Sequence, residues 1–285
     1  MAPHESSLTP VEAPGRPTLA LPLWPGLAAP DLRVVFPKGA PPRPRPALVV
    51  FRGGGYATSQ GSGKGSAEWA AEHGMVGLEV AYRTQASGEA FPKNYADAAR
   101  SVRLARARAT EWGIDPARVG VLGYSAGGHL ASLLSTQPGL HVDPADDQAT
   151  ISARPDFVLL AYPVISFTEG YSPSAFAGSA ENFLGKRDLD EATRRRYSNE
   201  RHVASDHPPV FVWTTADDEL VPAAHAQVFV EACKRASVPV TFKLYPRGPH
   251  GLGLALGQAD DVGGWTNEAL AWLRSRGVLA EAGSP

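Results

Sequence analysis

Short apolar, β-branched segments alternate with longer segments of helical periodicity along most of this chain of 285 residues. Several apolar segments are continuous, a pattern typical of strands that are covered on both faces. Strands are predicted at residues 32–36, 47–51, 76–82, 118–123, 156–162, 209–215 and 240–245. Helices are predicted at residues 62–73, 94–112, 126–136, 222–236 and 264–276. This alternation predicts an α/β fold, with a mostly parallel sheet and right-handed crossovers that place helices on both faces.

One connection in this pattern is much longer than a single crossover requires. Residues 164–208 separate two predicted strands and contain neither a second core nor a repeat. We interpret them as a small cap-like insertion over the carboxyl edge of the sheet. At the start of the chain, repeated prolines predict an extended tail over residues 1–18. The remainder, residues 19–278, is expected to form a single domain that includes the insertion.

The composition argues against several classes of partner. The formal net charge is −2, so no overall field would attract nucleic acid or an anionic membrane. Four arginines within residues 100–108 follow a helical pattern and are expected to form a solvated helix face. No apolar segment approaches the ~20 residues of a membrane helix, and no leader is evident, so a cytoplasmic protein is expected. The single cysteine, Cys233, is expected to be buried in a helix.

The segment Gly-Tyr-Ser-Ala-Gly at residues 123–127 lies between a predicted strand and a predicted helix. In that context, a G-x-S-x-G pattern places the serine hydroxyl on a sharp, exposed turn at the end of the strand. The amino end of the following helix favours a developing negative charge. Two glycines around a serine are also compatible with an ordinary turn. The flanking strand and helix favour Ser125 as a nucleophile.

A nucleophilic serine needs a histidine as its base and a carboxylate that orients the histidine. In this type of fold the acid and then the histidine follow the serine, each in a loop after a strand. The loop after one late strand offers Asp217, Asp218 and Glu219, and the loop after the last strand offers His250. Asp218 is preferred because a proline four residues later suits the start of the next helix. Asp217 is expected to support the loop.

No metal or cofactor is predicted. The other histidines have no partners at metal-ligand spacing, and His129, four residues after Ser125, is expected to be a hydrogen-bonded packing residue. An acidic turn at residues 143–147 is expected to be solvated rather than to bind calcium.

Three consecutive glycines, Gly53, Gly54 and Gly55, follow a predicted strand and Arg52. Attack by a serine creates an oxyanion, whose donors are the amide after the serine and an amide from the loop after an earlier strand. Glycines let that loop approach a substrate closely. The spacing does not fit a phosphate-binding loop or a dinucleotide fingerprint. A tight turn alone remains an alternative.

These segments together resemble the α/β-hydrolase superfamily, specifically its acetylxylan-esterase-like and feruloyl-esterase-like branch near the hormone-sensitive-lipase group. The resemblance covers roughly residues 20–275. It is carried by LPLWPG, VVFRGGGY, VAYR, the segment from DAARSV to GYSAGGHLAS, YPVIS, NFLG, PPVFVWTTADDELVP and GPHGLGL.

The resemblance implies a role for each of several residues. A catalytic triad is implied for Ser125, Asp218 and His250. Oxyanion-hole amides are implied for Gly54, Gly55 and Ala126. Substrate contacts are expected from Tyr56 and Tyr124. Relatives usually have histidine or proline before the glycines, where this chain has Arg52; we hypothesise that Arg52 pairs with a nearby carboxylate or carbonyl and fixes the loop.

The resemblance also implies a serine carboxylesterase that removes short acyl groups. Acetylated xylo-oligosaccharides or related sugars are the expected substrates, as small-molecule or oligosaccharide esters. Two alternatives stay open: a serine peptidase related to prolyl oligopeptidases, and a non-catalytic binding module with the same fold. The oligomeric state is not predicted.

Overall fold

The computed structural model describes residues 17–39, 44–171, 178–258 and 260–280. Within them, one sheet contains the strands β1 (Thr18–Pro22), β2 (Asp31–Val35), β3 (Arg45–Phe51), β4 (Val76–Val80), β5 (Ile114–Tyr124), β6 (Val158–Ala161), β7 (Val210–Thr215) and β8 (Val240–Tyr245). The α-helices are α1 (Ser66–Glu72), α2 (Lys93–Ala107), α3 (Ala109–Trp112), α4 (Ala126–Thr136), α5 (Gly178–Leu184), α6 (Glu191–Arg196), α7 (Ala224–Arg235) and α8 (Trp265–Ser275). Short 3-10 helices are η1 (Gln85–Ser87), η2 (Glu169–Tyr171), η3 (Asn199–Arg201) and η4 (Asp261–Gly264).

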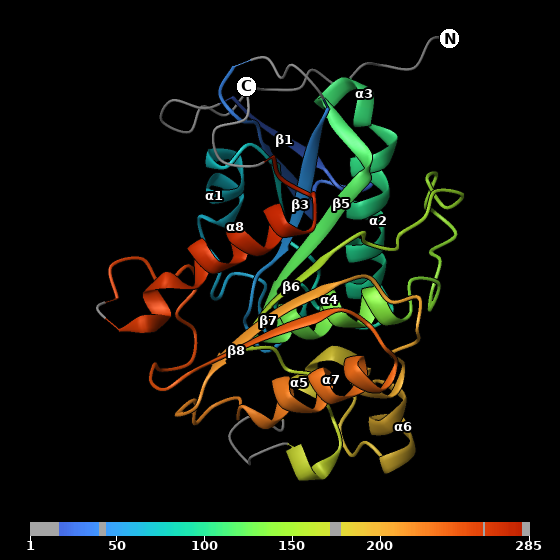
Figure 1. Ribbon diagram of the computed structural model, residues 1–285. Helices are drawn as coiled ribbons and strands as arrows, with labels where there is room; N and C mark the ends of the chain where they lie inside the picture. Colours follow the sequence, from blue (N-terminus) through green and yellow to red (C-terminus); the bar gives the residue numbers. More distant parts are fainter. Residues whose placement is uncertain (1–16, 40–43, 172–177, 259, 281–285) are drawn as a thin grey trace.

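The strands are ordered β1-β2-β4-β3-β5-β6-β7-β8 across the sheet (Figure 1). β2 is antiparallel to both of its neighbours, and every pairing from β4 to β8 is parallel. The predicted α/β fold with a mostly parallel sheet is confirmed. Because parallel strands end at the same edge, the loops after β3, β5, β7 and β8 converge there.

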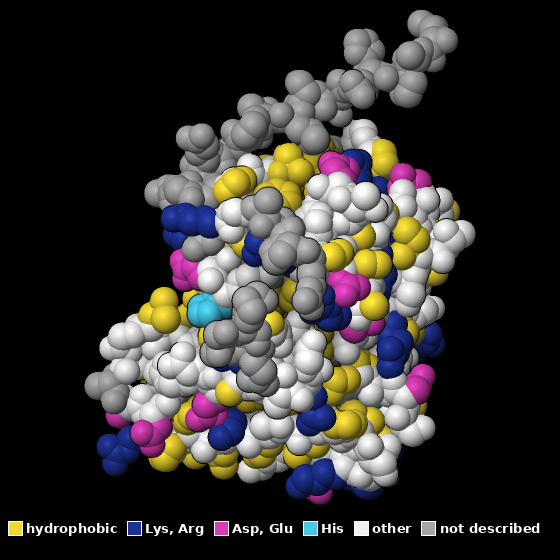
Figure 2. All heavy atoms as spheres, turned by 45° about the horizontal axis from the view of Figure 1, so that its top comes forward, with side chains coloured by type: hydrophobic (Ala, Val, Ile, Leu, Met, Phe, Trp, Pro, Cys, Tyr) yellow, Lys and Arg dark blue, Asp and Glu magenta, His cyan; other side chains and the backbone are white. Residues whose placement is uncertain are grey.

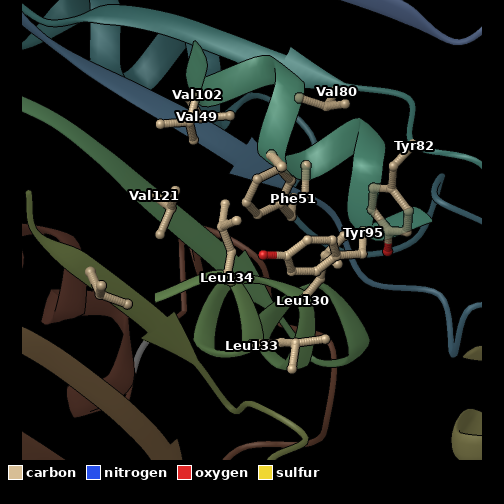
Figure 3. Close-up of a cluster of buried hydrophobic side chains, with 14 of the residues drawn as sticks. Val49, Phe51, Val80, Tyr82, Tyr95, Val102, Val121, Leu130, Leu133 and Leu134 are labelled. Atoms are coloured by element: carbon tan, nitrogen blue, oxygen red, sulfur yellow. The ribbon is translucent and has the colours of Figure 1, made fainter. Parts of the chain in front are cut away.

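Side chains alternate between the two covered faces of the sheet, as the pleat requires. Val49 and Phe51 of β3 face α2 and α4, where a cluster of buried apolar side chains fills the space between sheet and helices (Figure 3). Leu48 and Val50 point to the opposite face, where they join a second core with Trp69 of α1 and several residues of α8. Burial on both faces explains why these strand sequences are continuously apolar.

One strand and one helix break were not predicted from the sequence. β1 was not predicted, and it begins at Thr18, within the segment assigned to the tail; residues 1–16 of that tail lie outside the described residues. The helix predicted at residues 94–112 is two helices, α2 and α3, separated at Arg108. Gly113 then has a φ of 64° and ends α3 before β5 begins.

The arginines of α2 do not form a solvated face, so that prediction is wrong for them, whereas Arg108, just after the helix, is exposed. Arg100 and Arg103 are 3% and 4% exposed, and both donate to Asp146, which is 5% exposed. Asp143, also buried, pairs with Lys93. The expectation of a solvated acidic turn is therefore wrong for Asp143 and Asp146, whereas the side chain of Asp147 is 56% exposed. Opposite charges can be buried together when they pair in the folded protein. The helical pattern of the sequence alone does not show which distant carboxylate will pair with an arginine.

The segment between β6 and β7 contains η2, α5, α6 and η3, and its residues 172–177 lie outside the described part. In Figure 1, α5 and α6 lie at the lower end of the molecule beside α7. On the face shown in Figure 2, basic and acidic side chains are interspersed rather than gathered by sign. Among the described residues, no helix is both long and apolar enough to span a membrane.

Candidate active site

A sharp turn joins β5 to α4 at Ser125. The serine has a φ of 53°, a left-handed conformation that is unfavourable for a residue with a side chain. A Cβ atom on Gly127 would lie 2.1 Å from the carbonyl oxygen of Phe51, so only glycine fits where α4 passes the end of β3. The turn places the Ser125 side chain at the carboxyl edge of the sheet, beside the amino end of α4.

Ser125, His250 and Asp218 form a continuous hydrogen-bonded chain. Nε2 of His250 lies 2.8 Å from Oγ of Ser125, and Nδ1 of the same ring lies 2.7 Å from Oδ2 of Asp218. The Asp218 side chain is 1% exposed and that of His250 is 11% exposed. A carboxylate beside Nδ1 holds the proton there and leaves Nε2 free to accept the serine proton.

The structure separates the roles of the two neighbouring aspartates. Oδ1 of Asp218 accepts hydrogen bonds from the amides of Leu220 and Val221, which orient Oδ2 toward His250. Oδ1 of Asp217 instead accepts from the amide of Gly248, at 2.7 Å, just before the histidine. Asp217 therefore ties together the acid loop and the histidine loop, which confirms the expectation that it supports the site.

Tyr162 is a site residue that sequence reasoning missed. It follows β6 with a φ of 37°, and its ring lies edge-on to the ring of His250, with centroids 4.9 Å apart. Its hydroxyl accepts a hydrogen bond from the amide of Gly253, and burial raises the pKa of this hydroxyl. Tyr162 thus backs the imidazole and anchors the loop that follows it. The only sequence signal was its place after a strand, in the segment YPVIS.

The glycine loop after β3 lies against Ser125. A Cβ atom on Gly53 would lie 3.2 Å from Cβ of Ser125. Gly54 has a φ of 136°, and a Cβ atom there would lie 2.2 Å from the carbonyl oxygen of Thr58. The amides of Gly54, Gly55 and Ala126 donate to no other described residue. Amides without a partner, in the loop packed against Ser125 and in the residue after it, are the donors that an oxyanion hole requires.

Arg52 holds this loop as hypothesised. Its guanidinium donates to the carbonyl oxygens of Gln60 and Gly61, at 2.7 and 2.9 Å, and lies 3.4 Å from a carboxylate oxygen of Glu79. The Arg52 residue is 8% exposed, and its own carbonyl accepts from the hydroxyl of Tyr82. The side chain therefore joins the start of the glycine loop to the backbone at Gln60 and Gly61.

Tyr56 and Tyr124 do not present their side chains to a substrate. Both are fully buried. The hydroxyl of Tyr56 lies 2.8 Å from Nδ1 of His129, and that of Tyr124 lies 2.8 Å from Oγ of Ser66. The expectation of substrate contact is corrected: each aromatic ring packs beneath the loop or turn in which its backbone lies, because the surrounding strand ends leave an apolar space there.

The insertion reaches the glycine loop through Asn182 of α5. Its amide Nδ2 donates to the carbonyl oxygen of Gly55 at 3.0 Å. A cavity of about 320 Å³ is lined by residues 251–256, which directly follow His250 in sequence, together with residues 61–64.

Three further histidines are buried and hydrogen-bonded. Burial lowers the pKa of His129 to about 3 and the pKa of His207 and His225 to about 4, so each is neutral near pH 7. Within the described residues, no group of three or more His, Cys, Asp and Glu side chains is placed to hold a metal ion. Cys233 is buried as predicted, and burial raises its pKa to about 12.

A Ser–His–Asp chain at the carboxyl edge of this mostly parallel sheet defines an α/β-hydrolase fold with a serine-hydrolase type of site. Comparison with known families narrows this class. The model of the BD-FAE family matches residues 32–233, and the chain belongs to that family.

Solved structures and sequence relatives agree with this assignment. An acetyl ester-xyloside bifunctional hydrolase from Caldicellulosiruptor lactoaceticus is 33% identical with a TM-score of 0.78, over 92% of this chain and 97% of that chain. A thermophilic esterase from Thermogutta terrifontis is 28% identical with a TM-score of 0.78, over 96% of this chain and 97% of that chain. An acetylxylan esterase from Xylanibacter ruminicola is 33% identical over 73% of this chain, which spans 41% of that relative. The endo-1,4-beta-xylanase B of Butyrivibrio fibrisolvens is 33% identical over 74% of this chain, which spans 33% of that relative.

Proposed function

We propose that this protein is a serine carboxylesterase that removes short acyl groups from ester substrates through an acyl-enzyme. The observation that carries the proposal is the hydrogen-bonded chain from Ser125 through His250 to Asp218. In the first step, Oγ of Ser125 attacks the ester carbonyl carbon while Nε2 of His250 takes the hydroxyl proton. The amides of Gly54, Gly55 and Ala126 stabilise the resulting oxyanion.

The tetrahedral intermediate then collapses and the bond to the alcohol oxygen breaks. The imidazolium of His250 returns its proton to the leaving alcohol, and Asp218 stabilises the positive ring throughout. In the second half-reaction, water gives a proton to His250 and attacks the acyl-enzyme. The bond from the acyl carbon to Oγ of Ser125 then breaks, Oγ takes the proton from His250, and the carboxylic acid leaves. Residues 251–256, directly after the proton donor His250 in sequence, line a cavity with residues 61–64, and we assign the leaving alcohol to it.

We propose acetylated xylo-oligosaccharides or related acetylated sugars as the substrate class. Support comes from relatives that are an acetylxylan esterase and an acetyl ester-xyloside hydrolase. A short acyl group agrees with the position of α5, whose Asn182 binds the glycine loop beside the reacting carbonyl.

The deciding experiment compares wild-type protein with Ser125→Ala on p-nitrophenyl esters from acetate to octanoate and on acetylated xylo-oligosaccharides. We expect hydrolysis that is fastest for acetate and lost in the variant, with acetate released from the oligosaccharide. Equal rates in the two proteins would contradict the mechanism. An aminoacyl-p-nitroanilide, cleaved in preference to the esters, would favour the peptidase alternative. A folded wild-type protein with no activity on any of these would favour a binding module.

A further inference from the structure

The two halves of the proposed oxyanion hole come from separate elements, and one buried hydrogen bond joins them. Gly54 and Gly55 follow β3, whereas Ala126 is the first residue of α4. Tyr56 comes directly after the glycines, and His129 lies on the first turn of α4. The Tyr56 hydroxyl is 2.8 Å from Nδ1 of His129.

The backbone of the glycine loop does not hold this conformation by itself. Tyr56 has a φ of 56°, a left-handed conformation that is unfavourable for an aromatic residue. Such a conformation persists when surrounding contacts determine it. Here the contacts are made by the Tyr56 side chain, which is fully buried and packs against the rings of Tyr82 and Phe183 as well as His129.

The direction of the hydrogen bond follows from the second partner of His129. Nε2 of the ring lies 2.8 Å from the carbonyl oxygen of Tyr197, in the insertion. A carbonyl oxygen only accepts, so Nε2 carries the proton and Nδ1 presents a lone pair. The Tyr56 hydroxyl is therefore the donor. The ring is fully buried and stacked on Phe167 at a centroid distance of 4.1 Å, so its orientation is constrained from several sides.

We infer that Tyr56 and His129 are positioning residues of the oxyanion hole, because their hydrogen bond holds the loop of Gly54 and Gly55 in register with the helix of Ala126. This inference rests on the proposed esterase function. His129 also links the hole to the insertion: its carbonyl accepts from Nδ2 of Asn199, and its ring donates to Tyr197. The docking of the insertion and the shape of the oxyanion hole therefore both depend on His129.

The decisive variant is Tyr56→Phe, which deletes one hydroxyl and keeps the ring. Its matched control is Tyr95→Phe, since Tyr95 is also buried and its hydroxyl donates to the carbonyl oxygen of Gln137, away from the hole. Loss of a whole oxyanion donor reduces kcat about 100- to 1,000-fold. For Tyr56→Phe, which displaces donors without removing them, we expect kcat to fall about 10- to 100-fold, with KM within about threefold of wild type. Tyr95→Phe should stay within about twofold of wild type in kcat and show a similar loss of Tm.

A transition-state analogue distinguishes positioning from a general structural effect. A trifluoromethyl ketone adds to the catalytic serine, and its oxygen occupies the oxyanion hole. Its Ki for Tyr56→Phe should rise by the same factor by which kcat/KM falls, since both report the binding of the oxyanion. His129→Asn, which keeps an acceptor for Tyr56, should retain more activity than His129→Leu. The pH midpoint of kcat/KM should not move, because the His250–Asp218 pair is untouched.

A Tyr56→Phe variant with kcat and Ki within about twofold of wild type would overturn the inference, whatever its Tm. So would an equal loss of kcat in Tyr95→Phe. These outcomes differ from failure of the proposed function, in which wild-type protein would show no Ser125-dependent esterase activity at all.

Discussion

Replacing Asp218 by asparagine tests the geometry of the triad most directly. Oδ1 of Asp218 accepts from two backbone amides, those of Leu220 and Val221, at 3.0 and 2.9 Å. An asparagine NH₂ group cannot accept these bonds, so its oxygen must face the two amides. The NH₂ group then faces Nδ1 of His250, where the carboxylate oxygen had been at 2.7 Å.

This arrangement reverses the tautomer of the histidine. Nδ1 must accept from the asparagine NH₂, so the ring proton moves to Nε2, which then has no lone pair for the hydroxyl of Ser125. The same change in a serine protease lowers kcat by about 10⁴. We expect a loss of that size here, which corresponds to about 5 kcal/mol of transition-state stabilisation.

The assay is p-nitrophenyl acetate hydrolysis at saturating substrate, with Asp217→Asn as the matched control. Oδ1 of Asp217 accepts only from the amide of Gly248, and an asparagine oxygen can keep that bond, so a loss under about tenfold is expected. Asp218→Asn that retains more than about a tenth of wild-type kcat would refute the tautomer argument, as would an Asp217→Asn variant that loses about 10⁴.

Three further predictions concern Gly54, Arg52 and the buried His207. Gly54→Ala places Cβ 2.2 Å from the carbonyl oxygen of Thr58, so we expect kcat to fall about 100-fold or more. The control Gly139→Ala has open space around its Cβ and should match wild type. Equal rates for the two variants would contradict this prediction. Arg52→Met removes the hydrogen bonds to the carbonyl oxygens of Gln60 and Gly61. We expect it to lower the free energy of unfolding, measured in urea, by about 2 kcal/mol, and to lower kcat as well. If neither value changes, the arginine does not hold the loop in place. Burial lowers the pKa of His207 to about 4 in the folded state, so the unfolded state binds the proton first and stability is lost as pH falls from about 6.5 toward 4. His207→Gln should reduce the slope of unfolding free energy between pH 6 and 5 by about 1 kcal/mol per pH unit, and an identical slope would disprove the assignment.

Local patterns in the sequence were sufficient for most of the fold. The predicted strands correspond to β2 through β8, and the continuous apolar composition of β3, β6 and β7 reflects their burial on both faces of the sheet. β1 escaped prediction: it is five residues long, ends at Pro22 and lies at the edge of the sheet, where only one neighbour imposes a pattern. The long helix prediction missed the break at Arg108, which no glycine or proline marks.

The order of serine, acid and histidine in the sequence was also informative, since loops after parallel strands meet at one edge. The sequence favoured Asp218 over Asp217 only through the proline that follows four residues later. The hydrogen bonds of the structure show that the Asp218 carboxylate is the one that reaches His250. The burial of Arg100 with Asp146 could not be predicted, because the two residues lie 46 positions apart and each resembles a surface residue until its partner is known.

The sequence by itself determined the alternation of strands and helices, the turn at Ser125 and the presence of flexible glycines before Tyr56, since each depends on neighbouring residues and on whether a Cβ atom fits. Tertiary structure alone decided what each buried polar side chain touches. In the structure, the Tyr56 side chain, which was expected to contact substrate, is hydrogen-bonded to His129 instead. Tyr162 and Asn182, which were not predicted, lie at the site. The physical reason is that hydrogen bonds between distant segments depend on angstrom-scale placement, which local sequence preferences do not specify.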